Sequence, residues 1–306
     1  MDKIYDLIII GAGPAGLVAS IYASRYRLDH LIFGAQQGGQ MSEIADIENW
    51  PGDVIVVGRD LISRFVAHAE SYGIKVKNES VILIKKADGF FEVETSRGKY
   101  QAKSLILAMG AEYRKMNIPG EKEYIGKGVS YCATCDAPFF RDKTVAVIGG
   151  GNSAAVVAIE MSDYAQKTYL INKGEKMNAE PIWLEKIHSS PNIEIIKNTG
   201  VIEIRGNEKV EKIILDKEYD SRGEIAVGGV FIEVGSEPGV QLAKKLGMET
   251  DDGNYIKVNS DMSTSVSGVF AAGDITTGSN KFRQILTAAA EGAIAANSAY
   301  KMLKLK

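Results

Sequence analysis

The sequence predicts an α/β protein built from two Rossmann-like modules, with the second module inserted into the first. Three observations predict this fold. An apolar run, a glycine-rich turn and a segment of helical character follow one another at residues 4–26, and the same order returns at residues 144–163. A later apolar stretch runs into a glycine in both copies. The length of 306 residues agrees with about two domains of ~150 residues each.

The first module begins with a near-continuous apolar run at residues 4–10, which predicts a buried strand. The turn after it reads Gly11-Ala12-Gly13-Pro14-Ala15-Gly16, and residues 17–26 have helical character. Hairpin-like segments at residues 80–102 follow, and an apolar strand then ends at Gly110.

The second module repeats this order. Residues 144–148 predict a strand, residues 149–154 form the turn Gly-Gly-Gly-Asn-Ser-Ala, and residues 155–163 predict a helix. A strand at residues 167–171 completes a βαβ unit. Hairpin-like segments at residues 201–227 lead to a strand that ends at Gly235.

The C-terminal segment has no counterpart in the second module. Residues 268–274 read Gly-Val-Phe-Ala-Ala-Gly-Asp, and an alanine-rich helix is predicted from about Phe282 to Met302. This segment most simply returns to complete the first module. The expected domains are therefore residues 1–114 plus 237–306, and an inserted domain at residues 115–236.

Charge and cysteine content exclude several classes of protein. The 36 Lys and Arg against 39 Asp and Glu give a net charge of −3, and no basic cluster indicates a nucleic-acid or membrane partner. The uncharged residues 7–24 end in small side chains, as a secretory signal does, but Asp2 and Asp6 stand where a signal is basic. Two cysteines form no secreted disulfide framework. We expect a cytoplasmic protein.

Both glycine turns have the pattern of a dinucleotide site. The first glycine permits the tight turn, the second lets the backbone approach the pyrophosphate, and the third lets the helix pack on the strand. Such a turn also arises merely to join a strand to a helix, but two matches in the right context favour two nucleotide sites. In the second turn the expected contacts are Gly149, Gly151, Asn152, Ser153 and Ala154.

The two cysteines lie together in Cys132-Ala133-Thr134-Cys135. An inert pair or half of a zinc site would be the structural alternatives, but no other cysteine exists and the three histidines are scattered, so no metal site is expected. A disulfide that closes so small a loop stabilises the fold by only about 2 kcal/mol. Cycling between dithiol and disulfide is the better explanation. Asp136 is either a helix cap or the acid that protonates a leaving thiolate.

Six segments together resemble the low-molecular-weight thioredoxin reductases, in the family's order and over essentially the whole chain. They are residues 11–16, Gly38-Gly39-Gln40, Glu48-Asn49-Trp50-Pro51-Gly52, residues 132–136, residues 149–154, and residues 268–274 with Arg283-Gln284. The resemblance implies an FAD-binding domain built from both chain ends and an inserted NAD(P)-like domain that carries the cysteines. It also implies a homodimer that reduces thioredoxin or a thioredoxin-like protein.

The resemblance implies a role for individual residues. Cys135 would face the flavin, Cys132 would attack the disulfide of thioredoxin, and Asp136 would act as the acid. Phe139 and Phe140 would meet thioredoxin, although Pro138 departs from the family. The residues implied for FAD are Gly11, Gly13, Pro14, Ala15, Gly16, Phe33, Gly39, Gln40, Asn49, Gly273, Asp274, Arg283, Gln284 and Ile285.

The electron donor is where the chain departs from the family. Members that use NADPH have His-Arg-Arg after the second strand of the inserted domain and a further Arg four positions on, whereas this chain has Asn172, Lys173, Gly174 and Asn178. Lysine offers a point charge but not the two-pronged fork of arginine, and Asn172 is not the acid expected for NADH. NADPH and NADH both stay open as donors. Reduced ferredoxin or another non-nicotinamide carrier is a serious alternative.

Two other functions fit the same motifs. A dithiol oxidase would use oxygen on the same scaffold, and a flavin-bound redox sensor would have no useful turnover. Oxygen consumption with dithiols would identify the oxidase, and steady-state turnover with thioredoxin would exclude the sensor.

Overall fold

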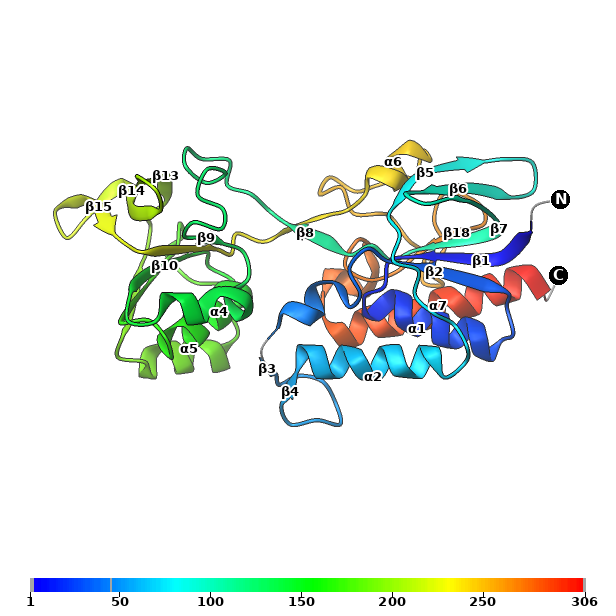
Figure 1. The fold of residues 1–306 in the computed structure, drawn as a ribbon, viewed down its shortest axis with the longest axis horizontal. Helices are drawn as coiled ribbons and strands as arrows, with labels where there is room; N and C mark the ends of the chain where they lie inside the picture. The colour runs from blue at the N-terminus through cyan, green and yellow to red at the C-terminus, as the bar shows by residue number, and fades with distance from the viewer. Residues whose placement is uncertain (1–2, 45, 305–306) are drawn as a thin grey trace. The chain divides into compact units, whose positions relative to one another are not determined.

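The computed structural model describes residues 3–44 and 46–304. The chain divides into two compact units: Met1–Glu112 together with Pro238–Lys306 forms unit 1, and Tyr113–Glu237 forms unit 2. Both ends of the chain therefore belong to unit 1, and unit 2 is an insertion between them (Figure 1).

Unit 1 is built on a six-stranded sheet of order β2-β1-β7-β6-β5, with β18 also paired to β7. β1 pairs in parallel with β2 and with β7, and β18 pairs in parallel with β7. The pairs β5–β6 and β6–β7 are antiparallel. Their bounds are β1 Ile4–Ile10, β2 His30–Phe33, β5 Val81–Lys86, β6 Phe91–Thr95, β7 Lys99–Leu107 and β18 Val269–Ala271. The apolar run predicted as a strand is β1, whose last five residues are all buried.

Three helices cover one side of this sheet in Figure 1: α1 (Pro14–Arg25), α2 (Gly58–Glu70) and α7 (Ile285–Lys304). Small residues let α1 and α7 pack closely, since a Cβ added at Gly292 would lie 2.1 Å from the carbonyl oxygen of Ala15. The other sheet face carries a second apolar cluster that includes Leu242 of α6. The remaining elements are η1 Gly39–Glu43, β3 Asp46–Ile47, β4 Val56–Val57, α6 Gln241–Lys245 and η3 Gly278–Lys281.

Unit 2 has three layers. A parallel sheet of order β12-β11-β10-β16-β9 lies between helices and a three-stranded antiparallel sheet of order β13-β14-β15. The strands are β9 Val129–Ser130, β10 Thr144–Ile148, β11 Lys167–Ile171, β12 Ile193–Ile196, β13 Val201–Gly206, β14 Val210–Tyr219, β15 Arg222–Ala226 and β16 Gly229–Ile232. The helices are α3 Ala133–Asp136, η2 Ala137–Phe140, α4 Asn152–Ser162 and α5 Pro181–Ser189. The α/β class with two Rossmann-like modules is confirmed.

The chain passes between the units twice, and the two passing segments pair with each other. They are β8 (Ala111–Tyr113) and β17 (Ser236–Pro238), which form a two-stranded sheet. On the unit 2 side the Arg114 amide donates to the Gly235 carbonyl at 2.9 Å, and on the unit 1 side the Gly239 amide donates to the Gly110 carbonyl at 3.2 Å. In each unit, the point where the chain leaves and the point where it returns are therefore hydrogen-bonded neighbours.

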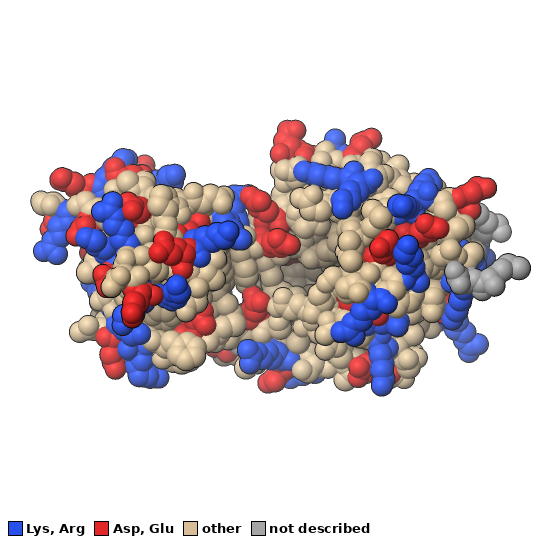
Figure 2. All heavy atoms as spheres, turned by 45° about the horizontal axis from the view of Figure 1, so that its top comes forward, with Lys and Arg blue, Asp and Glu red and all other residues tan. Residues whose placement is uncertain are grey.

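The surface carries charges of both signs. On the face drawn in Figure 2, Lys and Arg side chains are interspersed with Asp and Glu side chains. No helix within residues 3–44 and 46–304 is long and apolar enough to cross a membrane.

Candidate active site

The three glycines of the first turn have different surroundings. Gly11 has φ +114°, and a Cβ there would lie 2.0 Å from the Ala108 carbonyl oxygen, so the tight turn requires glycine. A Cβ at Gly16 would lie 1.8 Å from the Gly11 oxygen, so α1 could not pack on β1. At Gly13 the nearest atom would be 3.9 Å away. Gly13 therefore leaves open space at the start of α1, where a pyrophosphate fits.

Asp274 lies three residues after β18 and next to Gly273, where an added Cβ would lie 3.1 Å from the Ala15 side chain of α1. Burial raises the pKa of its carboxyl to about 6, although the charge of Arg283 lowers it. The backbone amide of Gly273 donates to the buried carboxylate of Glu291 at 2.8 Å, and the hydroxyl of Thr276 donates to the same oxygen at 3.0 Å. Glu291, which sequence reasoning missed, thus fixes the turn that presents Asp274.

Residues far apart in the sequence converge beside this turn. The Asn49 amide donates to Gln284 Oε1 at 2.9 Å, and the Gln40 amide donates to the Ala111 carbonyl at 3.0 Å. The Arg283 guanidinium lies 3.9 Å from the centre of the Tyr255 ring. Its Nε is buried and has no hydrogen-bond partner within the described part of the chain. The open space at Gly13 and this orphaned donor fit a bound FAD.

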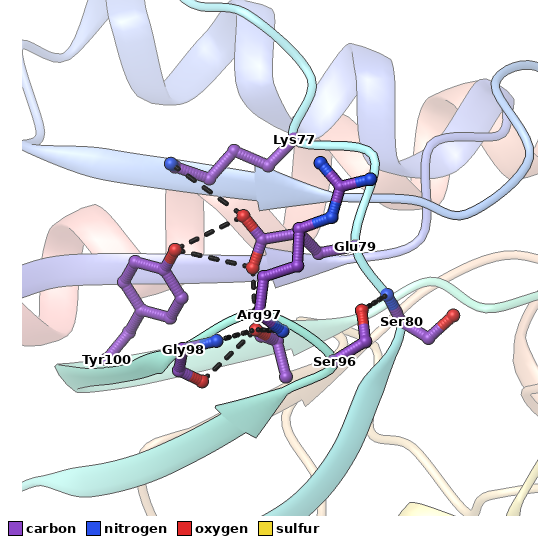
Figure 3. A network of polar contacts seen from close by, with 8 residues as sticks. Lys77, Glu79, Ser80, Ser96, Arg97, Gly98 and Tyr100 are labelled. Atoms are coloured by element: carbon purple, nitrogen blue, oxygen red, sulfur yellow. Dashed lines mark hydrogen bonds and ion pairs between the residues drawn. The ribbon is translucent and has the colours of Figure 1, made fainter.

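Phe33 ends β2 at the edge where the adenosine half of a dinucleotide is expected. Its ring contacts that of Tyr100, with centroids 5.0 Å apart. The Tyr100 hydroxyl donates to the buried carboxylate of Glu79, which also accepts from Thr95 at 2.6 Å and lies 4.0 Å from the Lys77 ammonium (Figure 3). The Lys77 amide donates to the Ile32 carbonyl at 2.9 Å, so this network lies beside the end of β2 that carries Phe33.

The two cysteines are joined as a disulfide, with Cα atoms 5.4 Å apart. Cys132 caps α3, and its sulfur accepts the Cys135 amide at 3.3 Å. The Cys132 amide in turn donates to the Ser130 hydroxyl at 3.0 Å. Asp136 is the last residue of α3 and is half-buried, while Cys135 is exposed. Cys135 is thus the more exposed of the two cysteines, and Cys132 is partly exposed.

Only one of the two phenylalanines expected to meet thioredoxin is on the surface. Phe139 is 72% exposed, but Phe140 is buried against Phe231, with ring centroids 5.1 Å apart. A Cβ at Gly229 would lie 2.3 Å from the Phe140 ring, so this aromatic fills the core behind α3. The expectation for Phe140 is wrong, because consecutive residues of η2 point in different directions.

The second glycine turn is built like the first but is closely covered. A Cβ at Gly149 would lie 2.2 Å from the Glu233 oxygen, and one at Gly150 would lie 2.3 Å from Asn172 Oδ1. Gly151 remains open, with the nearest atom 4.0 Å away. The Asn152 side chain exchanges two hydrogen bonds with Glu180, at 2.7 and 3.0 Å. Of the other expected contacts, Ser153 is exposed and Ala154 is buried.

Asn172 lies directly after β11, where a Rossmann unit distinguishes its nucleotide. Its buried amide donates to the carbonyls of Gly174 and Lys176, both at 3.0 Å, and its oxygen accepts the Gly174 amide at 3.2 Å. Its polar atoms are therefore engaged by the loop itself. The two lysines nearby, Lys173 and Lys176, are exposed.

Two carboxylates near the cysteines were not anticipated. The Thr134 hydroxyl donates to Glu160 Oε2 at 3.4 Å. Glu233 follows β16, and burial, with a smaller contribution from the charge of Glu160, raises its pKa to about 8. Alternation along β16 could have placed Glu233 on a covered face, but nothing local to the sequence connects it with Glu160.

Comparisons with known proteins agree with this geometry. Residues 5–292 match the pyridine nucleotide-disulphide oxidoreductase family. The chain is 40% identical to the thioredoxin reductase of Treponema pallidum over 302 residues, covering 98% of this chain and 97% of that protein. The crystal structure of Lactococcus lactis thioredoxin reductase is similar with a TM-score of 0.94 at 35% identity, covering 99% and 100%. A ferredoxin-flavin thioredoxin reductase from Clostridium acetobutylicum is similar with a TM-score of 0.55 at 34% identity, covering 100% of both chains.

Proposed function

The chain belongs to the thioredoxin reductases of the pyridine nucleotide-disulphide oxidoreductase family, and we propose that unit 1 holds its FAD and that unit 2 carries the electrons on Cys132 and Cys135. The enzyme is a flavoprotein disulfide reductase that acts on thioredoxin. The oxidase and sensor alternatives are not favoured. The observation that carries the proposal is the Cys132–Cys135 disulfide at the start of α3, in a chain whose other unit has an open glycine turn.

Bound FAD supplies a carrier that accepts electrons from the donor and passes them in pairs to the disulfide. The open space at Gly13 and the amides at the start of α1 would accommodate the pyrophosphate. Asp274 would accept hydrogen bonds from the cofactor, and the free Nε of Arg283 would donate one. The paired Asn49 and Gln284 would form the wall of the site at which both chain segments meet.

The two cysteines have different roles in this proposal. Cys132 attacks the disulfide of thioredoxin, because its sulfur already accepts the Cys135 amide and a thiolate there would be stabilised by the same bond. By the family resemblance Cys135 would face the flavin and would resolve the mixed disulfide. Asp136 protonates the thiolate that leaves thioredoxin. A homodimer is expected from the family, and sedimentation of the holoenzyme measures it.

We propose further that the physiological donor is not NADPH but a non-nicotinamide carrier, with reduced ferredoxin the first to test. Asn172 offers neither a guanidinium nor a carboxylate, and its amide is used by its own loop. Two lost charge-assisted bonds to the 2′-phosphate, at about 1.5 to 3 kcal/mol each, correspond to roughly a hundredfold or more in affinity. The similar ferredoxin-flavin thioredoxin reductase of Clostridium acetobutylicum supports this donor class.

Anaerobic reduction of the bound flavin by NADPH, NADH and reduced ferredoxin, each followed by stopped-flow absorbance, tests the donor. Fast reduction is expected with ferredoxin only. The double variant Lys173→Arg with Asn178→Arg should gain NADPH affinity if the missing arginines are the cause. Rapid reduction of the unchanged enzyme by NADPH, with a micromolar dissociation constant, would restore the ordinary NADPH-dependent enzyme.

A further inference from the structure

Glu233 lies on the sheet face that is covered by α3, the helix that carries the redox cysteines and is called the redox helix below. Its amide donates to the Ile148 carbonyl at 2.8 Å, so it continues the parallel pairing of β16 with β10. Side chains two residues apart on a strand share a face. Phe231, two residues before Glu233, packs in one apolar cluster with Ala133 of α3 and with Ala155 and Ala158 of α4. The backbone therefore directs Glu233 toward α3 and α4.

Glu160 reaches the same place from α4. Its carboxylate accepts the hydroxyl of Thr134, at 3.4 Å, and Thr134 lies between the two redox cysteines in the chain. The charge of Glu160 is the smaller of the two causes that raise the pKa of Glu233, so the two carboxyl groups lie within electrostatic range of each other. Two carboxyl groups from different elements thus share this sheet face, and Glu160 is hydrogen-bonded to the turn that carries the disulfide.

The titratable groups on the elements packed against this face come from three helices. Glu160 is on α4, and Cys132, Cys135 and Asp136 are on or beside α3, whereas β9 and β10 carry no ionisable side chain. The third helix, α5, packs in the same apolar cluster and carries Glu185, Lys186 and His188. Burial is the larger cause of the raised pKa of Glu233, about 8. At neutral pH Glu233 therefore holds a proton in the oxidised enzyme, directly after a strand whose Phe231 pairs with Ser130, two residues before Cys132.

We propose that Glu233 and Glu160 are positioning residues that act as an acid pair behind the redox helix and set the number of protons taken up when the Cys132–Cys135 disulfide is reduced. Reduction breaks the S–S bond with two electrons, which bound reduced flavin would supply in turnover and dithiothreitol supplies in the test below, and leaves each sulfur as a thiol or a thiolate. A sulfur left as thiolate adds negative charge near the acid pair. That charge holds the proton on Glu233 to higher pH, so reduction takes up a proton on the carboxyl as well as on sulfur.

The test is the pH dependence of the equilibrium between the holoenzyme and dithiothreitol. The chain has only 2 cysteines, so alkylation of free thiols followed by mass measurement counts the redox pair alone. Between about pH 8 and the higher pKa that Glu233 has in the reduced enzyme, reduction of the unchanged enzyme should take up one additional proton. That proton changes the equilibrium constant by a further tenfold per pH unit, or about 30 mV for two electrons.

Matched variants separate this role from a structural one. Glu233→Gln keeps the shape and should lose the additional tenfold step. Glu160→Gln should move its onset to lower pH, because the charge that raises the pKa of Glu233 is removed. Glu185→Gln, which removes an exposed acid from α5 of the same unit, should leave the curve unchanged. Curves with one common slope for the unchanged enzyme, Glu233→Gln and Glu160→Gln would refute the acid pair.

The inference rests on the proposed role of the two cysteines, and the same titration distinguishes the two failures. If Cys132 and Cys135 are not the redox pair, Cys132→Ser keeps the full rate of thioredoxin reduction. If only the acid pair is wrong, thioredoxin reduction and the titration persist with unaltered slope. Should Glu233→Gln not retain FAD, the shifted onset in Glu160→Gln still decides the question.

Discussion

Replacing Gly13 and Gly16 by alanine in separate variants should separate cofactor binding from folding. Gly13 has φ −81° and ψ −171°, which alanine adopts without strain, and an added Cβ meets no atom closer than 3.9 Å. The smaller entropy of the unfolded chain stabilises by about 0.4 to 1 kcal/mol, whereas alanine is a poorer helix cap by a similar amount. The free energy of unfolding of the apoprotein should therefore change by less than about 1 kcal/mol.

The affinity of Gly13→Ala for FAD, in contrast to its stability, should change substantially. The Gly13 methyl group would occupy the open space in which the pyrophosphate approaches the start of α1. Loss of one charge-assisted hydrogen bond, about 1.5 to 3 kcal/mol, weakens FAD by roughly 10- to 150-fold. In Gly16→Ala the Cβ lies 1.8 Å from a backbone oxygen, so the apoprotein itself should lose about 1 to 3 kcal/mol or more.

Urea unfolding of both apoproteins and titration with FAD, followed by flavin fluorescence, measure the two effects. Wild-type FAD affinity in Gly13→Ala would refute the assignment of this turn to the pyrophosphate. Equal destabilisation of the two apoproteins would refute the division of roles between the two glycines.

Four further outcomes are expected. Burial lowers the pKa of His30 below 6.5, so the unfolded chain binds its proton more readily; unfolding free energy should fall as the pH drops below about 6.5, and less so in His30→Gln. Glu291→Ala leaves two donors without their acceptor, at about 1 to 3 kcal/mol each, and urea unfolding should show this loss together with weaker FAD binding. Asp136→Asn should slow thioredoxin reduction at unchanged flavin absorbance, and an unaltered rate would leave Asp136 as a helix cap. Cys135→Ser should trap thioredoxin through Cys132 on a non-reducing gel, whereas Cys132→Ser should trap little and show a long-wavelength charge-transfer band; the reverse pattern would exchange the two roles.

Features that depend on neighbouring residues could be predicted from the sequence. The strand, turn and helix at β1 and α1 follow from the apolar run and from glycines whose added Cβ atoms would collide with the backbone. The position of Asn172 follows from counting along one βαβ unit, and the structure places it directly after β11. The helix expected from Phe282 begins instead at Ile285, because residues 279–281 have positive φ and precede it in a separate turn.

Features that depend on tertiary packing could not be predicted in this way. Glu291 acts on Gly273 across 18 residues, and no spacing rule connects a carboxylate in an alanine-rich helix with a turn before it. Glu121 accepts the hydroxyl of Tyr131 at 2.6 Å and the amide of Met116 at 2.9 Å, yet its sequence context is that of a surface acid. Phe139 and Phe140 are adjacent and chemically identical, and only the core behind α3 distinguishes them.

The paired crossings β8 and β17 make the insertion separable by genetic engineering. Because Arg114 and Gly235 are hydrogen-bonded neighbours, a gene for residues 113–237 would encode a polypeptide whose two termini meet, a property that favours independent expression and circular permutation. Because Gly110 and Gly239 are likewise neighbours, a short turn could replace the whole insertion in unit 1. The two units of this enzyme could thus be made as separate proteins. Unit 1 would be assayed for flavin absorbance and unit 2 for the thiols of Cys132 and Cys135.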